Sequence, residues 1–169
     1  MDILEIKEFF KDSFRTIIII IIIFIIISYG FSLQQVVGSS MEKTLSSGDI
    51  LVLNKVRYRI TDVKRKDIVA VYQDDKWIVK RVIGIPGDSI KVIDSNLYVN
   101  GTRVNEVYVD NKMTDDFQVI EKVPKNMYFI MGDNRNNSVD SRELGFISKK
   151  QIVGKSIIRI WPITKLKIL

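Results

Sequence analysis

Ser40 and Lys80 are the two residues whose types and surroundings could support covalent catalysis. The chain has 169 residues and contains neither cysteine nor histidine. These absences exclude a cysteine nucleophile, a disulfide and a Ser-His-Asp triad, and they remove the two favoured ligands of zinc. Nucleophilic catalysis then needs serine or threonine with a base other than histidine, for which lysine is the known substitute. A lone serine in a glycine-serine stretch such as residues 38–45 usually only forms a turn.

Lys80 lies in an apolar run, residues 77–83, that predicts a strand. Alternate residues of a strand share a face, so Ile78, Lys80 and Val82 point one way and Arg81 points the other. If the face of Lys80 is buried, desolvation lowers the pKa of the lysine, as a lysine base requires. Taken alone, the pattern favours the other interpretation, in which the lysine reaches water from an outer face.

Residues 132–145 form a third polar cluster, dense in short Asp, Asn and Ser side chains after a predicted strand. Such a cluster is typical of a surface turn. It could instead brace an active site by supplying hydroxyls and paired charges. Its carboxylates lack the spacing and the terminal Glu of an EF-hand calcium loop. We therefore predict no metal site, and no motif in the chain indicates a cofactor.

The elements that must position these residues begin with a membrane anchor. Residues 16–33 carry no charge, and their centre is almost entirely isoleucine. A helix of this length reaches roughly 27 Å, close to the ~30 Å hydrocarbon core of a bilayer. The run has no polar face, which argues against a buried core helix. Residues 1–15 mix charges with apolar side chains and predict a short amphipathic tail at the membrane face.

The anchor is predicted to remain attached, because no small-residue cleavage motif follows it. Lys7, Lys11 and Arg15 precede the apolar run, and no basic residue follows it before Lys43. The positive-inside rule then predicts a single-pass protein of the cell membrane with its N-terminus in the cytoplasm and residues 34–169 outside.

The net charge is +6, which suits an anionic membrane surface. The basic residues are scattered and no binding motif accompanies them, so nucleic acid is not an expected partner. A solvated, lysine-rich surface explains the charge most simply.

Residues 34–169 predict a mainly β catalytic domain, built as a compact antiparallel sheet or barrel. Short apolar runs alternate with turn signals, and no long helical period occurs beyond the anchor. Asn100 and Gly101 between apolar flanks are the strongest short hairpin signal. The polar residues 110–121 predict an exposed loop. The expected strands are residues 50–53, 68–72, 77–83, 90–93, the hairpin 97–104, 107–109, 127–131 and 157–161.

Four stretches together resemble the ordered boxes of bacterial type I signal peptidases of the Gram-positive kind. They are GSSMEKTL (38–45), SGDILVLNK (47–55), KRVIGIPGD (80–88) and GDNRNNSVDSRELG (132–145), and LYVNG (97–101) and GKSIIRIWP (154–162) are also similar. One box is moderately specific, whereas four in this order are highly specific. The resemblance covers the whole chain. It implies a membrane-bound Ser-Lys endopeptidase on a mostly β fold, which removes signal peptides from exported preproteins after small residues.

The resemblance implies three reacting or orienting residues. Ser40 takes the nucleophile position, Lys80 the general base, and Ser138 the hydroxyl that orients the lysine. Lys43 stands where the family usually has proline, which would fix the backbone of the loop. Gly38 stands where some relatives have a serine that helps to hold the oxyanion. Backbone N–H groups, including that of Ser40, are therefore expected to hold the oxyanion here.

Further positions are implied to support the site or to contact the substrate. Asp133 and Arg81 match positions that form a structural ion pair, and Asp140 and Arg142 match positions that give the site polar support. The substrate is expected to lie extended along residues 36–39 and 77–79, using main-chain hydrogen bonds. The pocket for its small residue is expected to be lined by Met41, Leu45, Ile78 and Val79.

Two alternatives compete with this interpretation. A membrane-anchored β module could hold exported subunits for assembly without cutting them, and absence of Ser40 or Lys80 would favour it. A Ser-Lys autoprotease of the repressor type would need a DNA-binding segment where this chain has its anchor. The partners that we expect are preproteins with signal peptides and membrane lipid.

Overall fold

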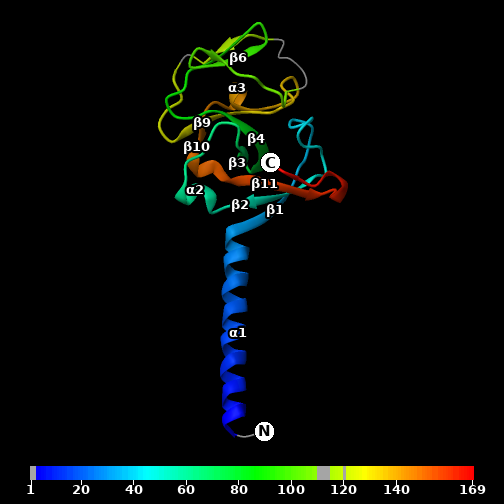
Figure 1. Cartoon of the computed structure of the whole chain (residues 1–169). Coiled ribbons are helices and arrows are strands. Elements are labelled where there is room, and N and C mark those ends of the chain that lie inside the picture. Colours follow the sequence, from blue (N-terminus) through cyan, green and yellow to red (C-terminus); the bar gives the residue numbers. More distant parts are fainter. Residues whose placement is uncertain (1–2, 110–114, 120) are drawn as a thin grey trace.

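A computed structural model describes residues 3–109, 115–119 and 121–169 of the chain. One long helix, α1 (Ile3–Gly30), leads directly into a β domain through strand β1 (Phe31–Gln35). Figure 1 shows α1 as a separate rod that projects from the β domain. The predicted mainly β fold with an N-terminal helix is confirmed.

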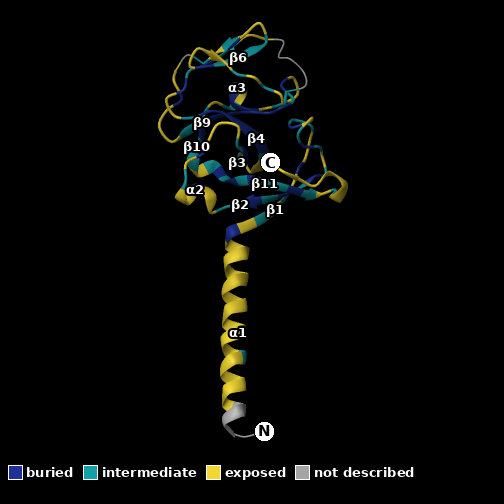
Figure 2. Ribbon diagram, viewed as in Figure 1, coloured by how far each residue is buried: buried dark blue, intermediate teal, exposed yellow. Residues whose placement is uncertain are grey.

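Helix α1 has the length and composition of a membrane-spanning segment. Its Lys7–Gly30 part is long and apolar enough to cross a bilayer, and the large apolar side chains from Phe9 to Tyr29 are exposed (Figure 2). An apolar surface of this extent is unfavourable in water and favourable in lipid. The boundaries differ from those expected, because one continuous helix replaces the separate tail and span. The helix ends at Gly30, since residues 31–33 pair with β2 as the start of β1.

The larger sheet is antiparallel throughout and has the order β1-β2-β11-β3-β4-β9-β10, with β12 paired to β11. Its strands are rich in Val, Ile and aromatic residues, which pack well on a pleated surface. Their bounds are β2 Ile50–Asn54, β3 Ile68–Gln73, β4 Lys76–Gly84, β9 Met127–Met131, β10 Ile147–Ser148, β11 Ile152–Trp161 and β12 Lys167–Ile168.

The smaller sheet lies at the end of the domain remote from α1 (Figure 1) and has the order β7-β6-β5-β8. Asn100 and Gly101 join β6 to β7 with φ values of 53° and 77°, which tight hairpin turns require. The predicted hairpin is therefore confirmed. The strands of this sheet are β5 Ile90–Ile93, β6 Asn96–Val99, β7 Thr102–Arg103 and β8 Phe117–Gln118.

Three clusters of buried apolar side chains hold the domain together. The first packs one side of the large sheet against helix α2 (Arg57–Ile60). The second joins the two sheets, and its members include Ile90 from β5 and Met131 from β9. The third packs Met41 and Leu45, from the loop after β1, against strands β2 to β4. This third cluster fixes the loop that carries Ser40, because each fully buried side chain of this size contributes about 1.5–3 kcal/mol.

Some segments differ from the sequence predictions. The apolar residues 107–109 predict a strand but form a turn, in which the Val109 N–H donates to the Glu106 carbonyl at 3.1 Å. Within the predicted loop 110–121, residues Phe117–Gln118 pair with β5, while 110–114 and 120 lie outside the described residues. Short helices that the sequence did not indicate are α2, α3 (Ser141–Leu144) and the 3-10 turns Lys149–Gln151 and Ile163–Lys165.

Candidate active site

Lys80 is buried on β4, on a face that the fold closes. Only 3% of the residue is exposed, and its neighbours on that face, Ile78 and Val82, pack in the first apolar cluster. Burial lowers the pKa of Lys80 to about 8, although the nearby carboxylate of Asp140 acts to raise it. A lysine with this pKa is partly neutral in mildly alkaline solution and can accept a proton. The face of Lys80 is thus a buried one, contrary to the interpretation that the pattern alone favoured.

A hydroxyl and a carboxylate from the segment after β9 hold the Lys80 amine. Lys80 Nζ donates to Ser138 Oγ at 2.9 Å, and Ser138 Oγ donates to Asp140 Oδ2 at 2.7 Å. Asp140 caps α3 and accepts from Arg142 Nε at 2.8 Å and from the Gly132 N–H at 2.9 Å. Burial acts to raise the pKa of Asp140, but these hydrogen bonds outweigh it and keep the pKa below its ordinary value. The network thus joins Lys80 to Ser138, Asp140 and Arg142.

Gly132 is the point at which the loops of the two serines meet. A Cβ atom added to Gly132 would lie 2.3 Å from Ser138 Oγ and 2.4 Å from the Ser40 carbonyl oxygen, closer than real Cβ contacts. The same carbonyl accepts a hydrogen bond from the Asn134 N–H at 3.0 Å. Glycine is therefore needed for the close approach of these backbones. Gly132 brings the loop of Ser40 alongside Ser138 and, through Ser138, to Lys80.

The loop of Ser40 is a tight turn whose apolar side chains are anchored in the core. The Leu45 N–H donates to the Met41 carbonyl at 2.7 Å, and both side chains pack in one cluster with Val79. This anchoring leaves Ser40 half-buried on the loop. Ile78, the fourth residue expected at the pocket, packs on the other side of β4, as strand alternation requires.

Two residues of this loop have left-handed backbone conformations. The φ of Lys43 is 77° and that of Gly38 is 85°. Proline is restricted to φ near about −65°, so the conformation at Lys43 is one that proline would exclude. The Lys43 Nζ donates to the Val109 carbonyl at 3.3 Å. A Cβ atom added to Gly38 would meet nothing within 4 Å, so the backbone conformation rather than crowding favours glycine there.

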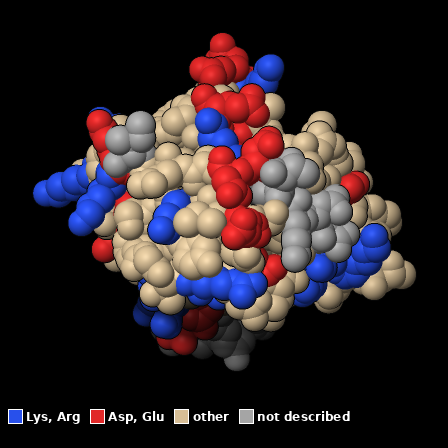
Figure 3. All heavy atoms as spheres, turned by 90° about the horizontal axis from the view of Figure 1, so that it is seen from above, with Lys and Arg blue, Asp and Glu red and all other residues tan. Residues whose placement is uncertain are grey.

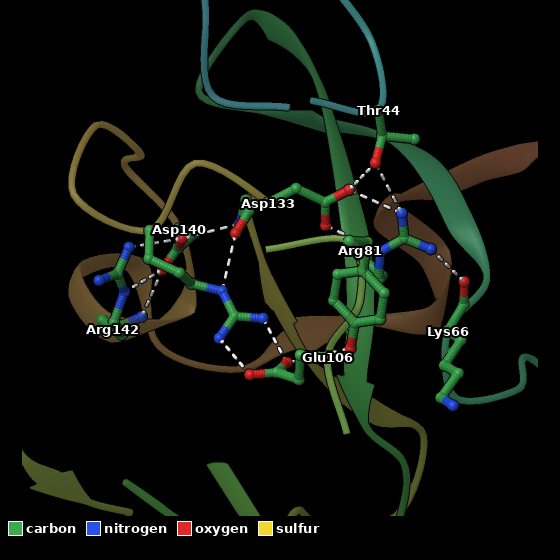
Figure 4. Close-up of polar contacts among 10 residues, drawn as sticks. Thr44, Lys66, Arg81, Glu106, Asp133, Asp140 and Arg142 are labelled. Carbon is green, nitrogen blue, oxygen red and sulfur yellow. Dashed lines mark hydrogen bonds and ion pairs between the residues drawn. The ribbon is translucent and has the colours of Figure 1, made fainter. Parts of the chain in front are cut away.

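Arg81 ties β4 to the same loop from the face opposite Lys80. Its Nε and Nη2 donate to the two oxygens of Asp133 at 2.8 and 2.6 Å. Thr44 Oγ1 donates to this carboxylate at 2.5 Å and accepts from Arg81 at 3.3 Å (Figure 4). A further nitrogen of Arg81 donates to the Lys66 carbonyl at 3.1 Å. The structure therefore contains the expected Arg81–Asp133 ion pair, which also positions Thr44.

A second arginine that the sequence analysis missed fixes the other end of the loop. Arg159 Nη1 donates to Asp49 Oδ2 at 2.9 Å and to the Thr44 carbonyl at 3.1 Å, and its Nε donates to the Lys165 carbonyl at 2.8 Å. A signal was available, because Arg159 interrupts the apolar run Ile157-Ile158-Arg159-Ile160. A charge within a strand of this kind needs a buried partner.

Three more residues near the site were given no individual role on the basis of the sequence. Arg135 Nε donates to the Gly132 carbonyl at 3.0 Å, and its Nη1 donates to Glu106 Oε2 at 2.9 Å. The Tyr108 hydroxyl donates to Glu106 Oε1 at 3.0 Å. No sequence signal pointed to these contacts, since Glu106 and Tyr108 lie outside the polar cluster 132–145.

The described part of the chain offers no metal centre and no continuous basic face on the side shown. No group of three or more potential metal ligands occurs among residues 3–109, 115–119 and 121–169.

Figure 3, which views the domain from above, shows Lys and Arg interspersed with Asp and Glu. The mixture of signs on this face agrees with a solvated surface.

Comparisons with known proteins identify the family. The family described as "Signal peptidase, peptidase S26" matches residues 6–161. Signal peptidase I of Bacillus caldolyticus is 43% identical over 79% of this chain and 81% of its own length. Signal peptidase I P of Bacillus subtilis subsp. natto is 41% identical over 92% and 91%. A crystal structure of a signal peptidase I from Enterococcus faecalis V583 matches with a TM-score of 0.52 and 33% identity, over 57% of this chain and 97% of that chain. The chain therefore belongs to the signal peptidase family, peptidase S26.

Proposed function

We propose that this chain is a membrane-anchored serine endopeptidase that removes signal peptides from exported preproteins, with Ser40 as nucleophile and Lys80 as general base. Membership of the peptidase family supports the reaction class. The observation that carries the assignment of residues is the environment of Lys80. Its amine is buried, has a pKa of about 8, and contacts Ser138, which shares the space around Gly132 with Ser40.

The reaction begins when neutral Lys80 takes the proton from Ser40 Oγ. Ser40 then attacks the carbonyl that precedes the scissile bond and forms a tetrahedral intermediate. Collapse of this intermediate releases the mature protein with a new amino terminus, to which Lys80 returns the proton, and leaves the signal peptide as an ester on Ser40. Lys80 next activates a water molecule, which hydrolyses the ester and frees the signal peptide. Ser138 accepts one N–H of Lys80 throughout and so orients the amine.

Backbone donors hold the oxyanion in this mechanism. The Ser40 N–H has no hydrogen-bond acceptor among the described residues, so it is free to serve. Gly38, two residues before the nucleophile, has no side chain to contribute. The oxyanion hole then depends on backbone N–H groups aimed at the developing negative charge. Loss of one such donor typically lowers the rate by about 10²–10³-fold.

The substrate binds as an extended strand in our proposal. Residues 76–80 of β4 pair with β3 on one side, whereas pairing with β9 begins only at Arg81 among the described residues. An unpaired strand edge can accept main-chain hydrogen bonds from a peptide. This edge and residues 36–39 are the two sides of the proposed cleft. Met41, Leu45 and Val79 are buried in one apolar cluster, and we expect the pocket beside them to take an alanine-sized side chain before the scissile bond.

Helix α1 holds the site at the membrane surface, with the N-terminus in the cytoplasm and residues 34–169 outside. The basic residues before the apolar run support this orientation. External protease added to right-side-out cells is expected to digest the β domain while the membrane stays intact. Protection of the β domain until the membrane is permeabilised would contradict the orientation.

The test of the proposed function is cleavage of a preprotein with an Ala-x-Ala site by the detergent-solubilised full chain. The parent is expected to cut after the final alanine, and Ser40→Ala is expected to abolish cutting. Ser39→Ala is the matched control, because it removes the adjacent hydroxyl, which accepts from Asn137 Nδ2 at 2.7 Å, and should leave most of the activity. A folded parent that cuts none of several such preproteins would overturn the proposal and favour a binding module.

A further inference from the structure

The small sheet sends a turn back toward the proposed active site. Glu106 and Tyr108 follow β7 of this sheet and lie far along the chain from both Ser40 and Lys80. Figure 4 shows Glu106 in the same polar network as Asp133 and Arg81. The turn therefore connects the part of the domain remote from α1 to the residues that surround Lys80.

Arg135 is the partner of Glu106 and is nearly inaccessible, with 3% of the residue exposed. Its Nη1 and Nη2 donate to Glu106 Oε2 and Oε1 at 2.9 and 2.5 Å, and its Nε donates to the Gly132 carbonyl at 3.0 Å. All three nitrogens are thus engaged. A buried guanidinium that loses its carboxylate is strongly unfavourable, so Glu106 fixes Arg135, and Arg135 fixes the Gly132 carbonyl.

Gly132 is held by hydrogen bonds on both sides of its Cα and is closely packed against both serines. Its N–H donates to Asp140, its carbonyl accepts from Arg135, and its Cα faces Ser138 Oγ and the Ser40 carbonyl with no space for a methyl group. A small rotation of this backbone would displace Ser138 or Ser40. Arg135 thus hydrogen-bonds to the residue against which both serines pack.

Tyr108 connects the same turn to the strand of the proposed base. Its hydroxyl donates to Glu106 Oε1 at 3.0 Å, and its ring lies 4.0 Å from Arg81 Cζ in a cation–π contact. Burial raises the pKa of Tyr108, so its hydroxyl remains a donor in neutral and mildly alkaline solution. Arg81 is the sequence neighbour of Lys80, and the turn thus contacts the site from two sides.

We propose that Glu106 is a positioning residue for cleavage, which acts through Arg135 to hold Gly132 where Ser138 can orient Lys80 beside Ser40. In this view the small sheet is part of the apparatus that aligns the nucleophile and the base. The inference rests on the proposed function, since it concerns the same reaction. It assigns no direct contact with substrate to Glu106.

The first test compares Glu106→Gln with Asp88→Asn in the full-length, detergent-solubilised chain. Asp88 is a matched control: its side chain is 4% exposed, it pairs with Arg65 through both oxygens, and it also accepts from the Ile85 N–H and from Asn100 Nδ2, which lie outside the proposed site. We expect Glu106→Gln to lower kcat about tenfold with KM within about twofold of the parent, because alignment rather than binding is lost. Asp88→Asn should lower Tm while leaving kcat near that of the parent.

The second test asks whether Glu106 acts through Ser138. In a Ser138→Ala background the added effect of Glu106→Gln should shrink to about twofold or less, because the contact it supports is already absent. An undiminished tenfold effect in both backgrounds would assign Glu106 a general structural role and overturn the inference. If Glu106→Gln does not fold, Tyr108→Phe can replace it in the same double-mutant comparison with Ser138→Ala. This change removes one donor to Glu106 and keeps the ring under Arg81.

The outcomes separate this inference from the proposed function. A parent that cleaves, together with Glu106→Gln at the parent's kcat, would overturn the inference and leave the function standing. A kcat loss in Asp88→Asn equal to that in Glu106→Gln would overturn it as well. A folded parent that cleaves no preprotein would overturn the proposed function and the inference together.

Discussion

Lys80 Nζ donates a 2.9 Å hydrogen bond to Ser138 Oγ, although 58 residues separate the two in the sequence. The Ser138 hydroxyl in turn donates a hydrogen bond to Asp140, so its oxygen offers a lone pair to the lysine. A neutral Lys80 can therefore donate here and keep its own lone pair for another partner. The protonation state of Lys80 governs both the reactivity and the pH-dependent stability of the site.

Cleavage is expected to rise with pH through the pKa of Lys80. Burial lowers this pKa to about 8, and only the neutral amine can take a proton from Ser40. Measured as kcat/KM on one preprotein at constant ionic strength, activity should climb with a midpoint near that value. A profile that is flat between about pH 6.5 and 9.5, with the chain folded throughout, would contradict the role of Lys80 as base.

Burial of Lys80 also makes the stability of the fold depend on pH. The direction is opposite to that of a lysine in a salt bridge, because burial lowers the pKa whereas a salt bridge raises it. The pKa of Lys80 is about 8 in the folded chain and about 10.4 when unfolded. Between these values the unfolded chain binds more protons, so this group makes stability rise with pH, and below both it destabilises the fold by up to about 3 kcal/mol.

Replacement of Lys80 by methionine removes this cost. Lys80→Met should exceed the parent in Tm most clearly near pH 6.5, with the gap narrowing as the pH approaches 10. The lost hydrogen bond to Ser138, worth about 1–2 kcal/mol, offsets part of the gain. A Tm difference between parent and variant that does not change with pH would show that Lys80 is not desolvated in the folded chain.

Gly132→Ala is expected to destroy the alignment of the two serines. The added methyl group would meet Ser138 Oγ and the Ser40 carbonyl at 2.3 and 2.4 Å, so one of them must move. We expect cleavage to fall by about 10²-fold or more, with an overpacking cost of about 1–3 kcal/mol in unfolding free energy.

Gly30→Ala is the control for this change. The nearest atom to its added methyl group, Val56 Cγ2, lies at 3.8 Å, an ordinary contact. Its kcat should match that of the parent. Normal cleavage by Gly132→Ala would mean that the two serines do not meet across this glycine.

The position of Lys43 is expected to tolerate glycine but not proline. Its φ of 77° costs a non-glycine residue about 1–2 kcal/mol, which glycine recovers in part and proline cannot adopt. Lys43→Gly should keep Tm and kcat close to the parent, whereas Lys43→Pro should lower both. Lys66→Gly, at a φ of 71°, is a control of the same residue type. Full activity in Lys43→Pro would show that the loop works equally well in another conformation.

The strands near the site could largely be predicted, because alternation and turn residues act locally. The runs 68–72, 77–83 and 127–131 became β3, β4 and β9, and Asn100-Gly101 formed its hairpin. The predicted end of the membrane anchor was less accurate. Residues 31–33 continue the apolar run in the sequence, yet they pair with β2, and hydropathy alone cannot distinguish a helix end from a strand start.

The burial of Lys80 and the contacts of Arg135 could not be obtained from local pattern. A strand pattern shows that Ile78, Lys80 and Val82 share a face but not which face the rest of the fold covers. Arg135 lies among asparagines that are typical of a surface turn, and its burial depends on its pairing with Glu106, from the segment after β7. Residues 107–109 look like a strand because they are β-branched and aromatic, whereas Tyr108 is held in a turn by Arg81 and Glu106.

The most direct test of the central claim is the rate of preprotein cleavage by Ser40→Ala, Lys80→Arg and the double variant. Arginine keeps the positive charge but cannot be deprotonated to act as a base. Residues that act as one unit are strongly non-additive, so each single variant should fall to the same residual rate as the double variant. Near-normal turnover by folded Lys80→Arg, or a further loss when the two changes are combined, would contradict a Ser40–Lys80 dyad.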